Sequence, residues 1–173
     1  MFETENTDLK IYKLWKEAHL PEYGTGLAAC FDLKASLRID DIVTVYDDRN
    51  IKGYRQVGRD RNVTIYSGQR VLFPTGLVFD LDITQSLRIH PRSGLALKNG
   101  ITVANCEGVV DPDYVQQSYV MLHNISTVPF DIVDGMRIAQ GEIVRAFQVN
   151  LVEIDYEPSA KSDRTGGFGS TGV

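Results

Sequence analysis

The stretch LVFDL, residues 77–81, carries an apolar side chain at every second position, and LRIH, residues 87–90, repeats the alternation. A period of two puts the apolar side chains on one face of an extended chain, as in a half-buried β-strand. A longer apolar run without an internal proline, residues 137–154, also predicts extended chain. Further strands are predicted from β-branched or aromatic runs at 43–46, 63–66, 70–73, 101–104, 108–110 and 118–122.

Turn residues separate these runs, for example at 67–68, 74–76 and 134–135. Helical patterns are short and are expected only at 12–18 and 93–99. Many short strands with few helical periods predict an all-β sandwich or barrel.

The composition is that of an ordinary globular chain: 173 residues, 43% hydrophobic and 24% charged. Eighteen basic and 23 acidic residues give a net charge of −5, which argues against general nucleic-acid binding and still allows a local basic pocket for a small anion. No apolar run approaches the roughly 18–20 residues of a membrane span, and the N-terminus is acidic rather than a targeting signal. We expect a cytoplasmic protein (host cytoplasm if the source is viral) with neither nucleic-acid nor membrane partner.

Two segments differ from the rest. Residues 47–62, DDRNIKGYRQVGRDRN, carry eight charges in sixteen positions and predict an exposed loop or polar hairpin within a charged insertion of about 40–62. This insertion is either a solvated loop or a surface for a protein partner. Residues 157–173 hold four glycines and too few apolar side chains to order themselves, which predicts a flexible tail after a domain of residues 1–156.

The segment PRSGLALKNGI, residues 91–101, follows a predicted strand and opens a predicted helix. Ser93 is suited to cap that helix. Arg92 and the Ser93 hydroxyl are equally suited to hold a phosphate at its start. The two interpretations are compatible.

In NCEGVVDPDYVQQ, residues 105–117, Asp111 and Asp113 flank a proline. Such a string usually forms a β-turn. A carboxylate held beside arginine and serine donors can instead orient and deprotonate a water molecule.

The string GGFGSTG, residues 166–172, is typical of a flexible linker or of a loop whose backbone approaches phosphates, with Ser170 and Thr171 adding hydroxyl donors. Phe168 among glycines favours stacking on a flat ring. The three histidines are scattered, and Cys30 and Cys106 lack the spacing of a zinc motif. No nucleophile elbow (GxSxG) and no P-loop (GxxxxGK[ST]) is found.

Five motifs in order resemble those of the trimeric dUTPases (deoxyuridine triphosphate nucleotidohydrolases), from about residue 8 to the C-terminus. They are ACFDLKA (29–35), PRSGLALKNGI (91–101), GVVDPDY (108–114), GMRIAQ (135–140) and GGFGSTG (166–172). The resemblance implies a jelly-roll-like β-barrel that forms a homotrimer with a flexible C-terminal tail and active sites between subunits. The implied reaction is hydrolysis of dUTP to dUMP and pyrophosphate with Mg²⁺, which limits uracil in DNA and supplies dUMP for dTMP synthesis.

The resemblance also assigns roles to residues. Asp111 would activate the attacking water, and Asp32 would act through water near the metal or support the site. Substrate would be bound by phosphate contacts (Arg92, Ser93, Gly94, Gln140), by base and sugar contacts (Asn105, Gly108, Tyr114) and by the tail (Arg164, Phe168, Gly169, Ser170, Thr171).

Three positions depart from the family pattern. Met136 replaces a common acid, Gln116 replaces a common glycine, and Arg164 lies one residue nearer the glycines. Two alternatives stay open. One is a dCTP deaminase relative, which needs a base-protonating glutamate and a more arginine-rich second motif. The other is a regulatory binding module on the same fold.

Overall fold

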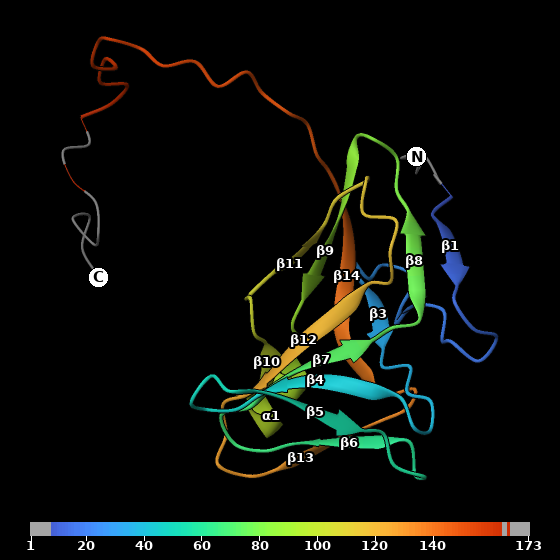
Figure 1. Ribbon diagram of the computed structural model, residues 1–173. Coiled ribbons are helices and arrows are strands. Elements are labelled where there is room, and N and C mark those ends of the chain that lie inside the picture. The colour runs from blue at the N-terminus through green and yellow to red at the C-terminus, as the bar shows by residue number, and fades with distance from the viewer. Residues whose placement is uncertain (1–7, 164–165, 167–173) are drawn as a thin grey trace.

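A computed structural model describes residues 8–163 and 166 of the chain (Figure 1). The only helix among them is α1 (Ser93–Asn99). The strands are β1 (Lys10–Lys13), β2 (Glu22–Tyr23), β3 (Phe31–Lys34), β4 (Ile42–Tyr46), β5 (Lys52–Gln56), β6 (Asn62–Ile65), β7 (Arg70–Pro74), β8 (Leu77–Asp80), β9 (Gln85–His90), β10 (Ile101–Val103), β11 (Gly108–Val110), β12 (Tyr119–Asn124), β13 (Phe130–Val133) and β14 (Arg137–Arg145).

Two five-stranded sheets form the body of the molecule, and every strand pairing is antiparallel. We call the sheet ordered β11-β9-β14-β3-β2 the first sheet and the one ordered β10-β12-β7-β4-β5 the second sheet. The ribbons β1-β8 and β13-β6 complete the barrel-like body (Figure 1). This architecture confirms the all-β prediction.

The core lies between the sheets because alternate residues of each strand point inward. In the first sheet Leu33, Leu87 and Ile89 are at most 3% exposed. Full burial of one such side chain contributes roughly 1.5–3 kcal/mol. At Gly141 of β14, a side chain would lie 2.3 Å from the ring of Phe31, so only glycine allows this close approach.

The predicted helix at 93–99 is confirmed, whereas the one predicted at 12–18 is wrong. Lys10–Lys13 pairs with β8, and the chain turns at Trp15, whose carbonyl oxygen accepts the Ala18 N–H at 3.1 Å. A seven-residue helix is marginal by itself, so strand pairing determines the conformation here.

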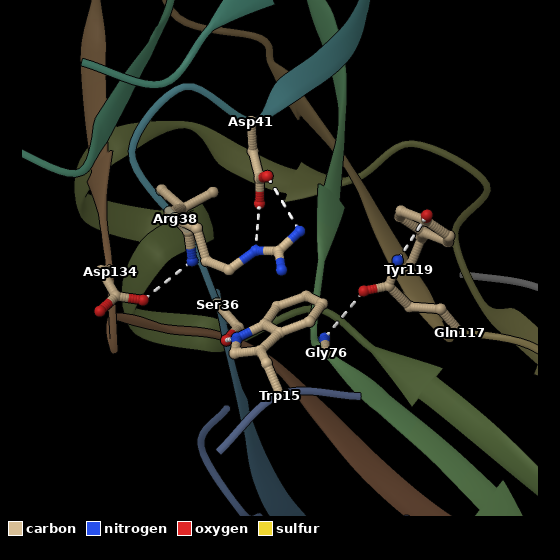
Figure 2. Close-up of polar contacts among 9 residues, drawn as sticks. Trp15, Ser36, Arg38, Asp41, Gly76, Gln117, Tyr119 and Asp134 are labelled. Carbon is tan, nitrogen blue, oxygen red and sulfur yellow. Dashed lines mark hydrogen bonds and ion pairs between the residues drawn. The ribbon is translucent and has the colours of Figure 1, made fainter. Parts of the chain in front are cut away.

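Trp15 anchors the turn after β1 to the chain that follows β3 (Figure 2). Its indole N–H donates to Ser36 Oγ at 3.1 Å, and the Arg38 guanidinium lies 4.3 Å from the ring centroid. Arg38 also makes paired bonds to Asp41 at 2.9 and 3.0 Å. The hydrogen bond to Asp41 raises the pKa of Arg38, so the guanidinium remains charged over this aromatic surface.

Of the two predictions for residues 47–62, the polar hairpin is the one observed. β4 and β5 pair from Ile42–Gln56 to Tyr46–Lys52. At its tip Asp47 Oδ1 accepts the N–H groups of Arg49 and Ile51 at 3.0 and 2.7 Å. β5 is an edge strand, so the hairpin extends the second sheet.

The long apolar run at 137–154 is strand only as far as Arg145. Residues 146–163, which we call the C-terminal arm, then leave the body (Figure 1). Apolar side chains of the arm are exposed within this chain, for example Leu151 at 93% and Phe147 at 80%. β3 pairs with β14 only as far as Gly141, and β9 pairs with it as far as Arg145. No strand within the described chain pairs with the arm, so β14 ends at Arg145. No helix in the described residues is long and apolar enough to cross a membrane.

Candidate active site

The hairpin predicted to bind the base borders a pocket of about 250 Å³ beside the edge strand β11. Ile89 of the first sheet and Leu72 of the second line it, so the pocket opens between the two sheets. All three predicted base and sugar contacts also line it: Asn105, Gly108 and Tyr114. A Cβ at Gly108 would lie 3.0 Å from Ile89, so glycine allows β11 and β9 to pack closely at this edge of the pocket.

Asp111 directly follows Val110, which lines this pocket. The turn predicted from Asp-Pro-Asp is present, since Tyr114 N–H donates to the Asp111 carbonyl at 3.1 Å. The Asp111 side chain is exposed, and within the described residues its carboxylate has no hydrogen bond or ion pair. The predicted turn is confirmed, and it presents an unpaired carboxylate beside the pocket. Action of Asp111 as a general base stays a prediction.

Hydrogen bonds to Gln117 hold the two tyrosines that line the pocket, Tyr114 and Tyr119; Figure 2 shows the bond to Tyr119. Gln117 accepts the Gly76 N–H at 3.1 Å and donates to the Tyr119 hydroxyl. The Tyr114 hydroxyl donates to the Gln117 carbonyl at 3.0 Å. Tyr119 and Tyr114 both line the pocket, so one glutamine orients two aromatic side chains.

Ser118 lines the same pocket and is 1% exposed. Among the described residues, its hydroxyl is the only buried side-chain polar atom without a hydrogen-bond partner. An unsatisfied buried hydroxyl costs about 1–3 kcal/mol. Such a group is suited to bond a polar ligand in the pocket.

The predicted phosphate contacts gather around Asp32 on another part of the first sheet. Asp32 is 6% exposed, and each of its oxygens is bound by a guanidinium. Arg92 Nε lies 2.9 Å from Oδ1, and Arg137 Nη1 lies 3.2 Å from Oδ2. Arg92 also donates to the carbonyl of Arg137 at 3.2 Å. The carboxylate thus holds two cationic side chains together.

Arg92 is the N-cap of α1, with extended backbone, and Ser93 is the first helical residue. The prediction that Ser93 caps the helix is therefore wrong. Ser93 and Gly94 are exposed, and a Cβ at Gly94 would meet nothing within 4 Å. Gln140 pairs in register with Asp32 on one side and His90 on the other. The second and fourth motifs therefore meet around Asp32.

The pocket and the Asp32 cluster face opposite sides of the first sheet. Gln140 pairs with His90, and Gly141 pairs with Ile89. Because neighbouring residues of a strand point to opposite faces, Ile89 faces the pocket while Asp32 and Gln140 face outward. One chain alone therefore does not place both groups around one ligand.

The fourth motif has Met136 in place of its usual acid, and Asp134 lies two residues before it. Met136 packs against the hydrophobic core. The nearby Asp134 carboxylate instead accepts the Leu37 N–H at 2.8 Å and pairs with Arg61 at 3.0 Å and His19 at 3.2 Å. These contacts tie this turn to the segment after β3. Gln116 is exposed, and the structure shows no consequence of its replacing glycine.

Arg137, Gln117, Ser118 and Tyr119 are site residues that the sequence analysis did not single out. Arg137 lies inside the fourth motif, and its charge beside a predicted anion site was the available signal. The other three follow the third motif, and only the fold shows that Ser118 and Tyr119 line the pocket and that Gln117 bonds to Tyr119. The predicted tail contacts Arg164, Phe168, Gly169, Ser170 and Thr171 lie outside the described residues.

Grouped side chains able to bind a metal occur once in the described residues, at Cys30, His90 and Glu142. They lie on the outward face that also carries Gln140. Burial, and then the charge of Glu142, raises the pKa of the Cys30 thiol, so the free thiol is protonated at neutral pH.

The dUTPase family model matches residues 56–172. The chain is 39% identical over 164 residues to the deoxyuridine 5'-triphosphate nucleotidohydrolase of Nautilia profundicola, covering 95% of this chain and 98% of that relative. A Staphylococcus bacteriophage 80alpha dUTPase solved with dUpNHpp has a TM-score of 0.74 and 18% identity, over 97% of this chain and 99% of that chain. A phage phi11 dUTPase, solved to show coordination of a structural Mg(II) ion, has a TM-score of 0.68 and 14% identity, over 88% and 100%.

Proposed function

The chain belongs to the dUTPase family, and from this membership we propose that it hydrolyses dUTP to dUMP and pyrophosphate. The observation that carries the proposal is the unpaired Asp111 carboxylate, held by a turn at the edge of a pocket large enough for a pyrimidine ring. A nucleotide base in that pocket would bring its α-phosphate toward this carboxylate.

In the proposed reaction Asp111 accepts a proton from a water molecule whose oxygen attacks the α-phosphorus. The bond between that phosphorus and the α–β bridging oxygen breaks, and pyrophosphate leaves with the bonding electron pair. General-base assistance of this kind contributes roughly 10²–10⁴-fold to the rate. Exposure of the Asp111 carboxylate in the described chain leaves it accessible to substrate and water.

Base selection is assigned to the pocket. Asn105 and the backbone of the hairpin would read the polar edge of uracil, and the unpaired Ser118 hydroxyl offers one further hydrogen bond. Gly108 and Ile89 pack so closely that a Cβ at residue 108 would lie 3.0 Å from Ile89, and a wall packed this tightly would disfavour the extra methyl of thymine. Tyr114, fixed through its hydroxyl, would pack on deoxyribose and exclude a 2′-hydroxyl. Selectivity of this type depends on unpaired polar groups or clashes with the wrong substrate.

Triphosphate binding is assigned to the Asp32 cluster. Arg92 supplies a guanidinium already oriented by Asp32, and Ser93, Gly94 and Gln140 supply donors beside it. Ser93 would lie near the bridging oxygen where charge develops on the leaving group. Because both Asp32 oxygens bind guanidinium groups, we propose that Asp32 mainly supports Arg92 and approaches a metal only through water.

Mg²⁺ fits this site as an ion bound by triphosphate oxygens and water. Mg²⁺ prefers oxygen ligands and keeps several waters. Asp32 is the nearest buried carboxylate of the cluster, and it is already paired. When bound, the ion would neutralise charge on the triphosphate, while the protein supplies Arg92 and Gln140.

The tail beyond the described residues is assigned the remaining contacts. Phe168 would stack on uracil, Gly169 would allow close backbone approach, and Ser170 and Thr171 would contact the γ-phosphate. Arg164 would add a phosphate contact if its displacement by one residue still permits it. A segment that closes on bound substrate excludes water and fixes the triphosphate.

A homotrimer is proposed because the two halves of the site face opposite sides of one sheet. The outward Asp32 cluster of one copy can meet the pocket of another, and cyclic symmetry closes such an arrangement. The exposed apolar side chains of the arm, such as Leu151 and Phe147, supply a surface that a neighbouring copy would bury.

The alternative of a regulatory module is supported only by the hairpin of β4 and β5, where Tyr54 is 68% exposed and Ile51 is 58% exposed. A protein partner there stays a prediction. Deleting residues 47–62 would also remove Val57, which is 1% exposed. A pull-down should therefore use paired Tyr54→Ser and Ile51→Ser substitutions, which leave the hairpin backbone in place.

The direct test of function is pyrophosphate release by the full-length chain with Mg²⁺ from dUTP, UTP, dTTP and dCTP. We expect hydrolysis of dUTP and little of the other three. Equal hydrolysis of all four would contradict the assigned base pocket, and release of ammonia from dCTP would favour the deaminase alternative.

A further inference from the structure

Cys30, His90 and Glu142 form a cluster of metal-ligating side chains that plays no part in the proposed hydrolysis. One sulfur, nitrogen or oxygen atom from each lies within 4.8 Å of the others. His90 Nε2 and Glu142 Oε2 are 3.0 Å apart. All three residues are half-buried in the single chain.

The fold creates this cluster from three adjacent strands. His90 of β9 pairs with Gln140 of β14, and Glu142 is two residues further along β14 on the same face. Phe31 of β3 pairs with Gly141, so Cys30, one residue earlier, comes level with Glu142. The ligands are thus fixed by backbone register in the middle of the first sheet.

The donor set is that of a transition metal. Thiolate and imidazole ligands favour zinc-class ions, whereas Mg²⁺ and Ca²⁺ favour oxygen. Tetrahedral ligands at 2.0–2.3 Å from Zn²⁺ lie about 3.3–3.6 Å apart. The three ligand atoms lie within 4.8 Å of one another, so the longest separation exceeds that range by at most about 1.2 Å. Three protein ligands and an open fourth position form a complete zinc coordination sphere when water is added.

We propose that Cys30, His90 and Glu142 bind one zinc-class ion per chain, with water as the fourth ligand. The thiol proton is released to solvent on binding. The site is separate from the Mg²⁺ assigned to the triphosphate. It would cross-link β3, β9 and β14, the strands that position Asp32 and Gln140. This inference does not depend on the proposed hydrolysis, and each can fail without the other.

Co²⁺ is a suitable probe because cobalt–thiolate ligation gives a charge-transfer absorption that Mg²⁺ cannot produce. Titration of the full-length chain with Co²⁺ should give this band at one ion per chain, and Zn²⁺ should displace it. Cys30→Ser should abolish the band, whereas the matched control Cys106→Ser, at the other and exposed cysteine, should retain it. Glu142→Gln should weaken binding at least about tenfold, since loss of even an outer partner of a metal ligand costs 10–100-fold.

Thermal unfolding supplies a second readout. Zn²⁺ should raise the melting temperature of the unsubstituted chain and of Cys106→Ser, but not of Cys30→Ser, because an ion that binds only the folded state stabilises it. Glu142→Gln keeps the size of the side chain, so it tests the same site if Cys30→Ser fails to fold. No cobalt band, a band that survives in Cys30→Ser, or one that requires Cys106 would overturn the proposal and leave an ordinary His90–Glu142 hydrogen bond.

Discussion

Two aspartates of the candidate site have opposite surroundings. The Asp32 side chain is 8% exposed and bound by two arginines, whereas Asp111 is exposed and lacks a partner in the described chain. A carboxylate held by two guanidinium groups is suited to orient them, and a free one can accept a proton. Their surroundings therefore separate a supporting role from a chemical one.

At Asp111, replacement by asparagine keeps the shape and removes the base. We expect Asp111→Asn to lower turnover of dUTP by at least about a hundredfold while binding changes little. Single-turnover kinetics and calorimetry with a non-hydrolysable dUTP analogue measure the two effects. Retained turnover would remove Asp111 from the chemical step, and loss of binding together with turnover would indicate a structural turn.

At Ser118, removal of the unpartnered buried hydroxyl should affect stability and substrate binding in opposite directions. Ser118→Ala removes an unsatisfied group, so the free energy of unfolding should stay the same or rise. The KM for dUTP should rise about five- to tenfold, since one hydrogen bond to the substrate is lost. Urea unfolding measures the effect on stability, and steady-state kinetics measure the effect on KM. An unchanged KM would show that the hydroxyl does not contact the substrate.

At the residue scale, the sequence predicted which residues belong to the motifs better than it predicted which side chains they contact. Asp32, Arg92 and Gln140 come together as expected of three motifs at one site. The charge of Arg137 inside the fourth motif was visible, but its pairing with Asp32 was not predictable, because 105 positions separate the two residues and only strand register brings them close. Cys30 and His90 meet for the same reason.

Among the elements too, some could be predicted from the sequence and others could not. Alternating strands were predictable because burial on one face leaves a period of two in the sequence. The turn at Trp15 was not, since its conformation depends on pairing with β8 and on a contact to Ser36. The end of β14 also depends on its neighbours, as the apolar composition continues past Arg145 while the partner strands do not.

Within β14, Gly141 is the element's most constrained position. Gly141→Ala should destabilise the fold by about 1–3 kcal/mol, because its Cβ would overlap the Phe31 ring between packed strands. Gly53→Ala in the exposed β5 is the matched control, since a Cβ there meets nothing within 4 Å. Equal urea midpoints for the two variants would contradict the packing described for β14.

For the tail, removal of residues 163–173 should leave the fold and its thermal stability unchanged and should severely reduce dUTP hydrolysis. The segment has four glycines and little apolar surface, so the body loses few contacts. Phe168→Ala alone should cost about 1–3 kcal/mol in kcat/KM, as for one stacked base. Arg164→Ala distinguishes whether the displaced arginine reaches the phosphates. Full activity of the truncated chain would show that the tail does not close the site.

At the scale of the whole molecule, a single chain does not bring the two halves of the candidate site together. Its pocket faces between the sheets, its arginine cluster faces outward, and its arm carries exposed apolar side chains. The family resemblance predicted a trimer, and the opposite facing of the two half-sites supplies a physical reason for one. Light scattering should give three times 19.3 kDa, about 58 kDa.

Subunit complementation tests the shared site most directly. Asp111→Asn and Arg92→Gln change different half-sites, so each variant alone should be inactive. Co-expressed with different tags and purified as mixed trimers, they should recover activity, because some sites then combine an intact Asp111 from one subunit with an intact Arg92 from another. Every mixed trimer then has one competent site of three, which predicts about a third of the unsubstituted rate for dUTP when two subunits build each site. Mixed trimers as inactive as either parent would contradict the account, since both residues would then have to act from the same chain.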